Sequence, residues 1–159
     1  MKYLNSIYDL LLEEVQSYQW ELVSDGDKKV KYTFDDDNGN SYLVEIKSLP
    51  GNRGDDVSTN WELVYFVVDE DKYMRFFSVT KIVNANPYKT VQTIFGDILR
   101  DFIKRKSWVK TIMIHGLAKD KEREYISQRT KMYVRFLERN PIPGYKLSNY
   151  GNIINLTKM

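Results

Sequence analysis

The chain of 159 residues contains no cysteine and a single histidine, His115. The absence of cysteine excludes disulfides, thiolate metal ligands and cysteine nucleophiles, and it fits a reducing compartment. A single histidine likewise excludes a metal site built from several imidazoles. We therefore expect neither a metal site nor a cofactor.

Long apolar runs are absent as well. No stretch approaches the roughly 20 apolar residues that span a bilayer, so we expect no contact with a membrane. The opening residues MKYLNSIYDLLLEEVQ hold one short apolar run followed directly by Glu13 and Glu14, which is not the pattern of a secretory signal peptide. These features predict a soluble protein that works inside a cell or inside an assembly.

Phosphate-binding glycine loops are missing too. Gly51, Gly54 and Gly96 do not have the spacing of such a loop, and no Gly-Lys-Ser/Thr follows them. The acidic run DDDNG at 35–39 lacks the glutamate that would close a calcium loop, because Ile46 stands at the twelfth position. Since no catalytic constellation is evident, we favour a function other than catalysis.

The chain does contain a large apolar and aromatic fraction. Hydrophobic residues make up 42% of the sequence and aromatic residues 14%, which is typical of a folded domain with a substantial core. No linker-like stretch divides the pattern. We therefore expect one domain over residues 1–159.

Alternation of apolar and polar residues predicts most of the strands. In KVKYTF, Val30, Tyr32 and Phe34 alternate with polar residues, and the Asn38-Gly39 pair that follows is a hairpin signal because both residues tolerate positive φ. The remaining predicted strands are QWELVSD, SYLVEIKSL, WELVYFVVD, YMRFFSVTKI, VKTIMIHG, GYKLSNY and NIINLTK. A polar loop over residues 50–60 follows SYLVEIKSL, and GYKLSNY and NIINLTK are expected to form a hairpin.

Helical periodicity marks residues 3–17, the segment after Pro87, and residues 122–141. In the second segment apolar residues recur at i, i+3, i+4, i+7, i+8, i+11 and i+12 from Val91, so we predict a central core helix at 90–104. This order of elements predicts an α+β fold, a largely antiparallel twisted sheet with an N-terminal helix and two C-terminal helices packed on it. Within it, the strand–helix–strand unit of residues 73–116 fits a parallel crossover.

The net charge of +2 conceals a strong asymmetry. Residues 1–71 contain 6 Lys/Arg and 16 Asp/Glu, whereas residues 72–159 contain 18 and 6. Either the two halves neutralise each other on folding, or a basic surface remains exposed for nucleic acid or an acidic partner. For the nucleic-acid alternative the candidate contacts are Arg105, Lys106, Trp108 and Lys110.

The third predicted helix carries Arg129 in the middle of its apolar stripe, four residues from both Tyr125 and Tyr133. Three interpretations remain open: the side chain lies at the edge of the stripe with its charge in water, it forms a buried ion pair with a carboxylate from the acidic half, or it binds an anionic ligand. The third interpretation makes His115, Lys119, Arg129 and Tyr133 a candidate site for a ligand or partner.

From about Thr90 onwards the chain resembles small proteins of uncharacterised function from tailed bacteriophages. The resemblance lies in the helix TVQTIFGDILRDFI, the strand VKTIMIHGLA, the spacing of Arg129, Tyr133 and Leu137, and the segment GYKL near the end. It implies a viral origin, and hence a protein of the host cytoplasm or of the virion.

The same order of strands and helices is similar to the C-terminal half of the acetyl-coenzyme A-dependent acetyltransferase fold. In that family a glycine-containing loop opens the helix after the central strand, and its backbone amides bind pyrophosphate. Here the junction reads NANPYKTVQT, which has no glycine, and Pro87 lacks an amide donor. The departure argues against the transferase activity.

Our leading hypothesis is therefore a non-enzymatic bacteriophage protein that binds a phage or host protein, either as a virion component or as an accessory factor. The alternatives are an acetyltransferase-like enzyme with a divergent cofactor site, and a nucleic-acid-binding protein that uses the basic C-terminal half. The oligomeric state does not follow from the sequence.

Overall fold

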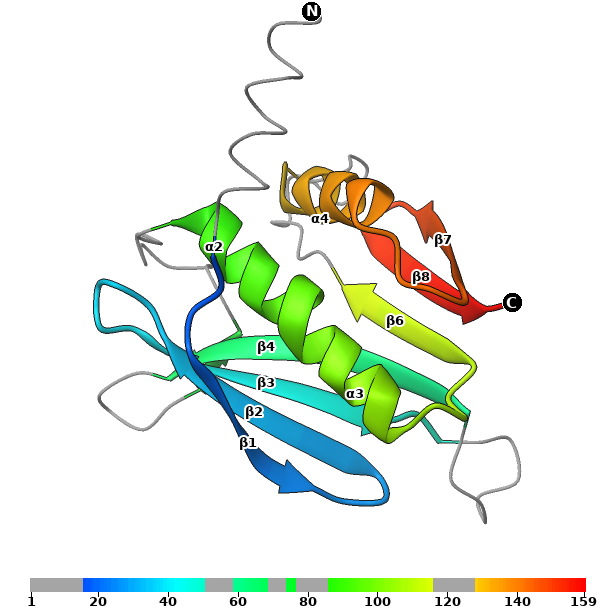
Figure 1. Ribbon diagram of the computed structural model, residues 1–159, viewed down its shortest axis with the longest axis horizontal. Helices are drawn as coiled ribbons and strands as arrows, with labels where there is room; N and C mark the ends of the chain where they lie inside the picture. Colours follow the sequence, from blue (N-terminus) through cyan, green and yellow to red (C-terminus); the bar gives the residue numbers. More distant parts are fainter. Residues whose placement is uncertain (1–15, 51–58, 69–73, 77–85, 116–127) are drawn as a thin grey trace, which may run out of the picture.

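A single sheet carries the helices of this chain on one of its faces (Figure 1). The computed structural model describes residues 16–50, 59–68, 74–76, 86–115 and 128–159, with the backbone alone for 74–76, 128 and 129. The strands are β1 Trp20–Asp25, β2 Lys29–Asp35, β3 Ser41–Ser48, β4 Asn60–Val68, β5 Met74–Phe76, β6 Thr111–His115, β7 Tyr145–Tyr150 and β8 Ile153–Lys158. The helical segments are α2 Pro87–Val91, η1 Gln92–Ile98, α3 Leu99–Arg105 and α4 Gln128–Arg139.

The strand order is β1-β2-β3-β4-β6-β8-β7, and β5 pairs with the end of β4. All neighbouring strands are antiparallel except β4 and β6, which run parallel with Leu63 opposite Ile114. The predicted α+β class and largely antiparallel sheet are therefore confirmed. The parallel crossover predicted within residues 73–116 is wrong. β5 returns from β4 in a hairpin and so runs opposite to it, which leaves β4 as the parallel partner of β6.

The chain from Pro87 to Arg105 is one continuous helix that passes through α2, η1 and α3. Asn86 caps it, because its side chain accepts a hydrogen bond from the Lys89 backbone N–H, and Pro87 follows at the first position, where no N–H is needed. η1 is wider than an α-helix, and the Leu99 N–H accordingly bonds to the Ile94 carbonyl, five residues back. The predicted core helix at 90–104 is confirmed.

This helix packs across β2, β3 and β4, and we call the face of the sheet beneath it the covered face (Figure 1). The aromatic centre of the contact is Phe102 on Trp61, whose rings lie 5.3 Å apart and are both fully buried. Tyr32 reaches the same helix, and its hydroxyl donates a 2.8 Å hydrogen bond to Asp101. Alternation along the strands then directs the intervening residues to the opposite, open face, on which no described helix lies.

Some predictions fall outside the described residues. Of the predicted N-terminal helix at 3–17 only residues 16 and 17 are described, and they are not helical. Most of the polar loop at 50–60 and the first turns of the helix predicted at 122–141 are also outside the description. No helix of the described segments is long and apolar enough to cross a membrane.

The acidic first half and the basic second half meet in direct ion pairs. Asp25 of β1 lies 3.0 Å from the Lys106 ammonium and 3.5 Å from the Arg105 guanidinium at the end of α3. Since Lys106 is almost fully buried, its charge needs this partner. Part of the charge asymmetry is thus neutralised inside the fold.

Truncation of the central aromatic contact should destabilise the protein strongly. We expect Phe102→Ala to lower the free energy of unfolding by about 3–5 kcal/mol, because the side chain is fully buried on Trp61 and its removal leaves a cavity. Chemical denaturation monitored by circular dichroism measures the change. Lys104→Ala on the exposed side of the same helix is the control, and equal stabilities of the two variants would contradict the assignment of the core.

Stability should also fall at alkaline pH. Burial, together with the hydrogen bond and charge of Asp101, raises the pKa of Tyr32 above its ordinary value. The unfolded chain releases this proton above pH of about 10, whereas the folded chain retains it, so the free energy of unfolding declines as the pH rises beyond that point.

Tyr32→Phe removes this contribution. We expect its unfolding free energy to decline less steeply than that of the wild type above pH of about 10.5, by up to about 1.4 kcal/mol per pH unit. Denaturant titrations between neutral pH and the alkaline limit measure the slope. Tyr150→Phe at an 85% exposed position is the matched control. An unchanged slope in Tyr32→Phe would show that this hydroxyl does not couple to folding.

Candidate functional site

His115 lies at the last position of β6, on the open face of the sheet. Its Nε2 is 3.5 Å from a carboxylate oxygen of Glu62 on β4, and Glu62 also lies 3.4 Å from the Lys47 ammonium on β3. These three side chains form a row across neighbouring strands, in which the Glu62 carboxylate lies between the Lys47 ammonium and the His115 imidazole. Such a row is typical of cross-strand pairing on a solvated sheet face.

Tyr133 lies on the covered face, where α4 packs against the core helix. Its hydroxyl and that of Tyr65 share a short hydrogen bond, and its ring lies 4.8 Å from the Phe95 ring. The side chain is almost completely buried. Tyr133 therefore contributes to the junction of α4, the core helix and β4.

The structure does not bring His115 and Tyr133 together, because the sheet separates them. Ile114 points to the covered face, so the next residue, His115, must point to the open face. Arg129 is placed in the first turn of α4, but its side chain is outside the description, as is Lys119 entirely. A role for Lys119 and Arg129 in binding stays a prediction.

The candidate nucleic-acid contacts occupy the end of α3 and the turn into β6. Arg105 lies 2.7 Å from Asp101 and, like Lys106, also pairs with Asp25, so both cations are partly neutralised. Trp108 is 43% exposed and packs edge-on against Trp61 with ring centres 5.9 Å apart. Of the four predicted contacts, only Trp108 and Lys110 remain exposed without an acidic partner in the ion pairs of the described residues.

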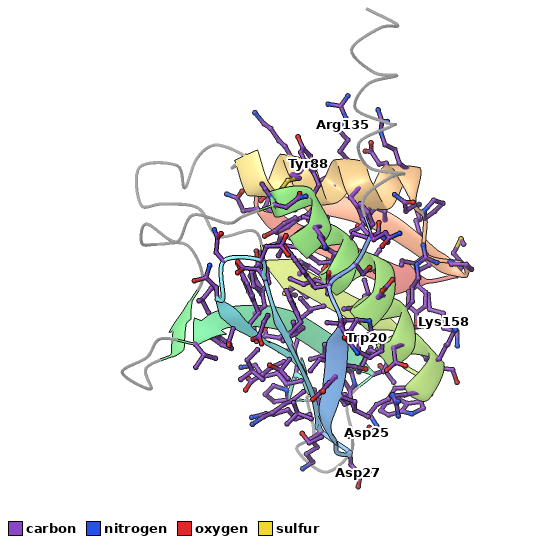
Figure 2. The ribbon with its side chains drawn as sticks, turned by 60° about the vertical axis from the view of Figure 1, so that its left-hand side comes forward. Trp20, Asp25, Asp27, Tyr88, Arg135 and Lys158 are labelled. Atoms are coloured by element: carbon purple, nitrogen blue, oxygen red, sulfur yellow. The ribbon has the colours of Figure 1, made fainter. Side chains whose placement is uncertain are left out.

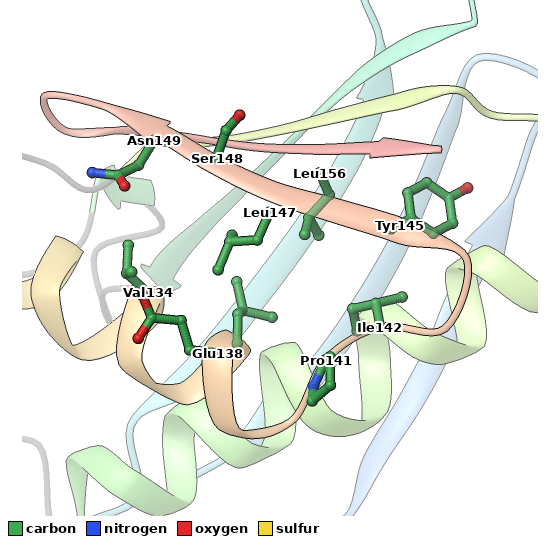
Figure 3. A pocket seen from close by; sticks show the side chains of 10 residues that line it. Val134, Glu138, Pro141, Ile142, Tyr145, Leu147, Ser148, Asn149 and Leu156 are labelled. Atoms are coloured by element: carbon green, nitrogen blue, oxygen red, sulfur yellow. The ribbon is translucent and has the colours of Figure 1, made fainter. Parts of the chain in front are cut away.

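A cavity of about 310 Å³ lies between α4 and the β7–β8 hairpin (Figure 3). Seven of its ten lining residues are apolar or aromatic, while polar and apolar atoms share its exposed surface about equally. The apolar lining comes from Val134, Leu137, Pro141, Ile142, Tyr145, Leu147 and Leu156, and the polar rim from Glu138, Ser148 and Asn149. Figure 3 shows Leu147 directed from β7 toward α4, with Val134 facing it from the helix.

Local sequence explains the walls of this cavity. α4 presents Val134, Leu137 and Glu138 on one side because residues three and four apart share a helix face. The helix then ends before the Asn-Pro-Ile-Pro-Gly stretch, since proline cannot continue it, and Gly144 reverses the chain at φ +83°. β7 and β8 follow as a hairpin whose turn places Gly151 at φ +58°.

Three long-range hydrogen bonds hold the cavity in shape. One Arg100 Nη donates to the carbonyls of Asn140 and Pro141, at 3.2 and 3.3 Å, and so fastens the loop after α4 to the core helix. The Tyr145 hydroxyl donates a 2.6 Å hydrogen bond to the Val109 carbonyl, and burial raises the pKa of this tyrosine. The Tyr145 hydroxyl is therefore engaged in a structural hydrogen bond, and the cavity offers a ligand both apolar and polar surface.

This cavity was not predicted from the sequence. The sequence contained one sign of it. The two closely spaced prolines of NPIPG, between a predicted helix and a predicted hairpin, prevent the helix from continuing into the segment before the first strand of that hairpin. Metal chemistry has no comparable site, because no three His, Asp or Glu side chains within the described parts of the chain are arranged to hold an ion.

Comparisons with protein-family models, with curated proteins and with solved structures found no match to this chain. The function must therefore be inferred from its own residues.

Proposed function

We propose that this chain is a non-enzymatic bacteriophage protein that binds a phage or host protein through the cavity between α4 and the β7–β8 hairpin. It serves either as a virion component or as an accessory factor. The observation that carries the binding role is the cavity, which combines an apolar lining with an exposed polar rim. The viral origin is supported by the resemblance of the C-terminal half to small phage proteins.

The chemistry of the cavity favours binding over catalysis. A volume of about 310 Å³ is close to the lower size of small-molecule pockets and is ample for one or two aliphatic side chains. Burial of one such side chain contributes about 1.5–3 kcal/mol. The rim residue Glu138 then provides a hydrogen-bonding group that orients what enters.

The exposed rim allows a direct test of this role. A photo-crosslinking amino acid at Glu138, which lines the cavity from α4 and is exposed, should capture a discrete protein in the cells that naturally produce this chain. The same amino acid at Lys29, which is exposed five strands away across the sheet, is the matched control. Mass spectrometry identifies the products. Identical products from both positions, or none from Glu138, would contradict binding at the cavity.

An acetyltransferase-like enzyme is the second candidate, favoured by the parallel pair β4 and β6. Their described pairing runs up to Leu63 and Ile114, and β4 then continues to Val68 with β5 as its partner. Ligands of open sheets commonly bind beyond the carboxyl ends of parallel strands. The strand and helix order also agrees with the resemblance to that fold.

The N-terminus of the core helix weakens this second candidate. Pro87 has no N–H, the Lys89 N–H is bound by the Asn86 side chain at 3.2 Å, and the Thr90 N–H is bound by the Asn86 carbonyl at 3.1 Å. Few amides at this helix end are thus available to bind a pyrophosphate.

Calorimetry with acetyl-coenzyme A separates the two candidates. We expect no saturable heat of binding, because the amides that would bind the pyrophosphate are engaged by Asn86. The cavity variant Val134→Glu should give the same flat titration as the wild type. Saturable binding in the micromolar range would reverse our order of preference and support the enzyme.

A further inference from the structure

β7 forms the last strand of the sheet, and no described strand pairs with its outer edge (Figure 1). Its six residues pair with β8 in unbroken register from Tyr145 to Tyr150. The opposite edge strand, β1, differs because a bulge interrupts its register between Leu22 and Ser24. A bulge is a common protection against the addition of another strand, and β7 lacks one.

The hydrogen-bonding pattern shows which backbone groups of β7 point outward. The Met159 N–H donates to the Gly144 carbonyl, so the next bonded pairs toward the turn are Lys146 with Thr157 and Ser148 with Asn155. In an antiparallel pair the residues between bonded pairs direct their N–H and C=O groups away from the neighbour. The backbone groups of Leu147 and Asn149 therefore face the outer edge.

The outward-facing residues of β7 also line the cavity. The Leu147 and Asn149 side chains are part of its wall and rim, so backbone donors and the apolar hollow lie along the same strand (Figure 3). An added strand would place alternate side chains on the same face as Leu147. One of these side chains would enter the space between α4 and β7.

The surface around this edge is strongly basic. Residues 128–159 contain six Lys/Arg and a single acidic residue, Glu138. Among these cations Lys131, Arg135 and Lys146 are exposed on α4 and β7 (Figure 2 labels Arg135). A segment with aspartate and glutamate beside its apolar residue complements this charge.

We propose that β7 receives an extended acidic segment of a partner protein by strand addition, with one aliphatic side chain of that segment inserted into the cavity. This inference rests on the proposed binding function and specifies its mode. Main-chain hydrogen bonds to Leu147 and Asn149 provide affinity, the cavity selects the apolar residue, and the basic surroundings select the acidic flanks.

Synthetic peptides of strand length test the mode directly. One set has a central leucine between valine and threonine with aspartate and glutamate at both ends. A second set has lysine in place of the acids, and a third has aspartate in place of the leucine. We expect the first set to bind saturably at low salt and to shift the NMR amide signals of Leu147 and Asn149, with at least about tenfold weaker binding of the other two sets.

A matched pair of variants isolates the backbone contact. Asn149→Pro removes an outward N–H that β8 does not use, a substitution that edge strands tolerate, and should weaken the first set about tenfold or more. Asn149→Ala keeps the N–H and should bind within about twofold of the wild type if the backbone carries the contact.

A second pair tests the charge without touching the strand backbone. Lys146→Glu should weaken the acidic peptides, whereas Lys29→Glu, the same change at the far side of the sheet, should not. Circular dichroism confirms that each variant is folded.

Several outcomes would overturn the inference. These are equal binding of acidic and basic peptides, shifts confined to other parts of the sheet, no binding by any set, or equal effects of Asn149→Pro and Asn149→Ala. Pairing of β7 with a second copy of the chain, seen as a dimer by light scattering that Asn149→Pro abolishes, would also overturn it. If the crosslink at Glu138 still captures one protein under any of these results, the binding function survives and only the strand-addition mode fails.

Discussion

The contact of the helix Pro87–Arg105 with the covered face is the constraint on which the rest of the structure depends. Phe102 on Trp61 and Tyr32 on Asp101 fix the helix against three strands, and Phe95 on the same helix receives Tyr133 of α4. α4 is thus positioned by a helix that is itself positioned by the sheet. The shape of the cavity beside α4 therefore depends on these contacts. Arg100 of the helix Pro87–Arg105 also binds the loop after α4 that forms one side of the cavity.

Much of this architecture followed from periodicity. The 3.6-residue repeat from Val91 predicted the core helix, and the alternation in KVKYTF predicted β2 with its buried Val30, Tyr32 and Phe34. Local signals were less informative about pairing. The parallel partner of β6 is β4 and not the strand β5 that directly precedes the core helix, and the alternation within each strand does not specify this.

The candidate site was harder to predict than the fold, because a site depends on how separate elements meet. The sequence suggested that His115, at the end of a predicted strand, and Tyr133, on the following predicted helix, lie close together. Because side chains alternate along β6, His115 points to the open face, while Tyr133 lies on the covered face, so the sheet separates them. Conversely, Leu147 and Val134 are separated by the NPIPG loop and carry no motif, yet they face each other across the cavity. The charge asymmetry was visible in the sequence, but only the structure shows that Asp25 pairs with both Arg105 and Lys106.

The unequal edges of the sheet also set a limit on stoichiometry. Open-ended growth by strand pairing requires two receptive edges on every molecule, so that each copy can continue the array. The bulge between Leu22 and Ser24 disturbs one edge, which leaves β7 as the regular edge among the described strands. Once a strand has added to β7, a molecule of this chain therefore has no second regular edge among its described outer strands β1 and β7 with which to continue an array of its own copies.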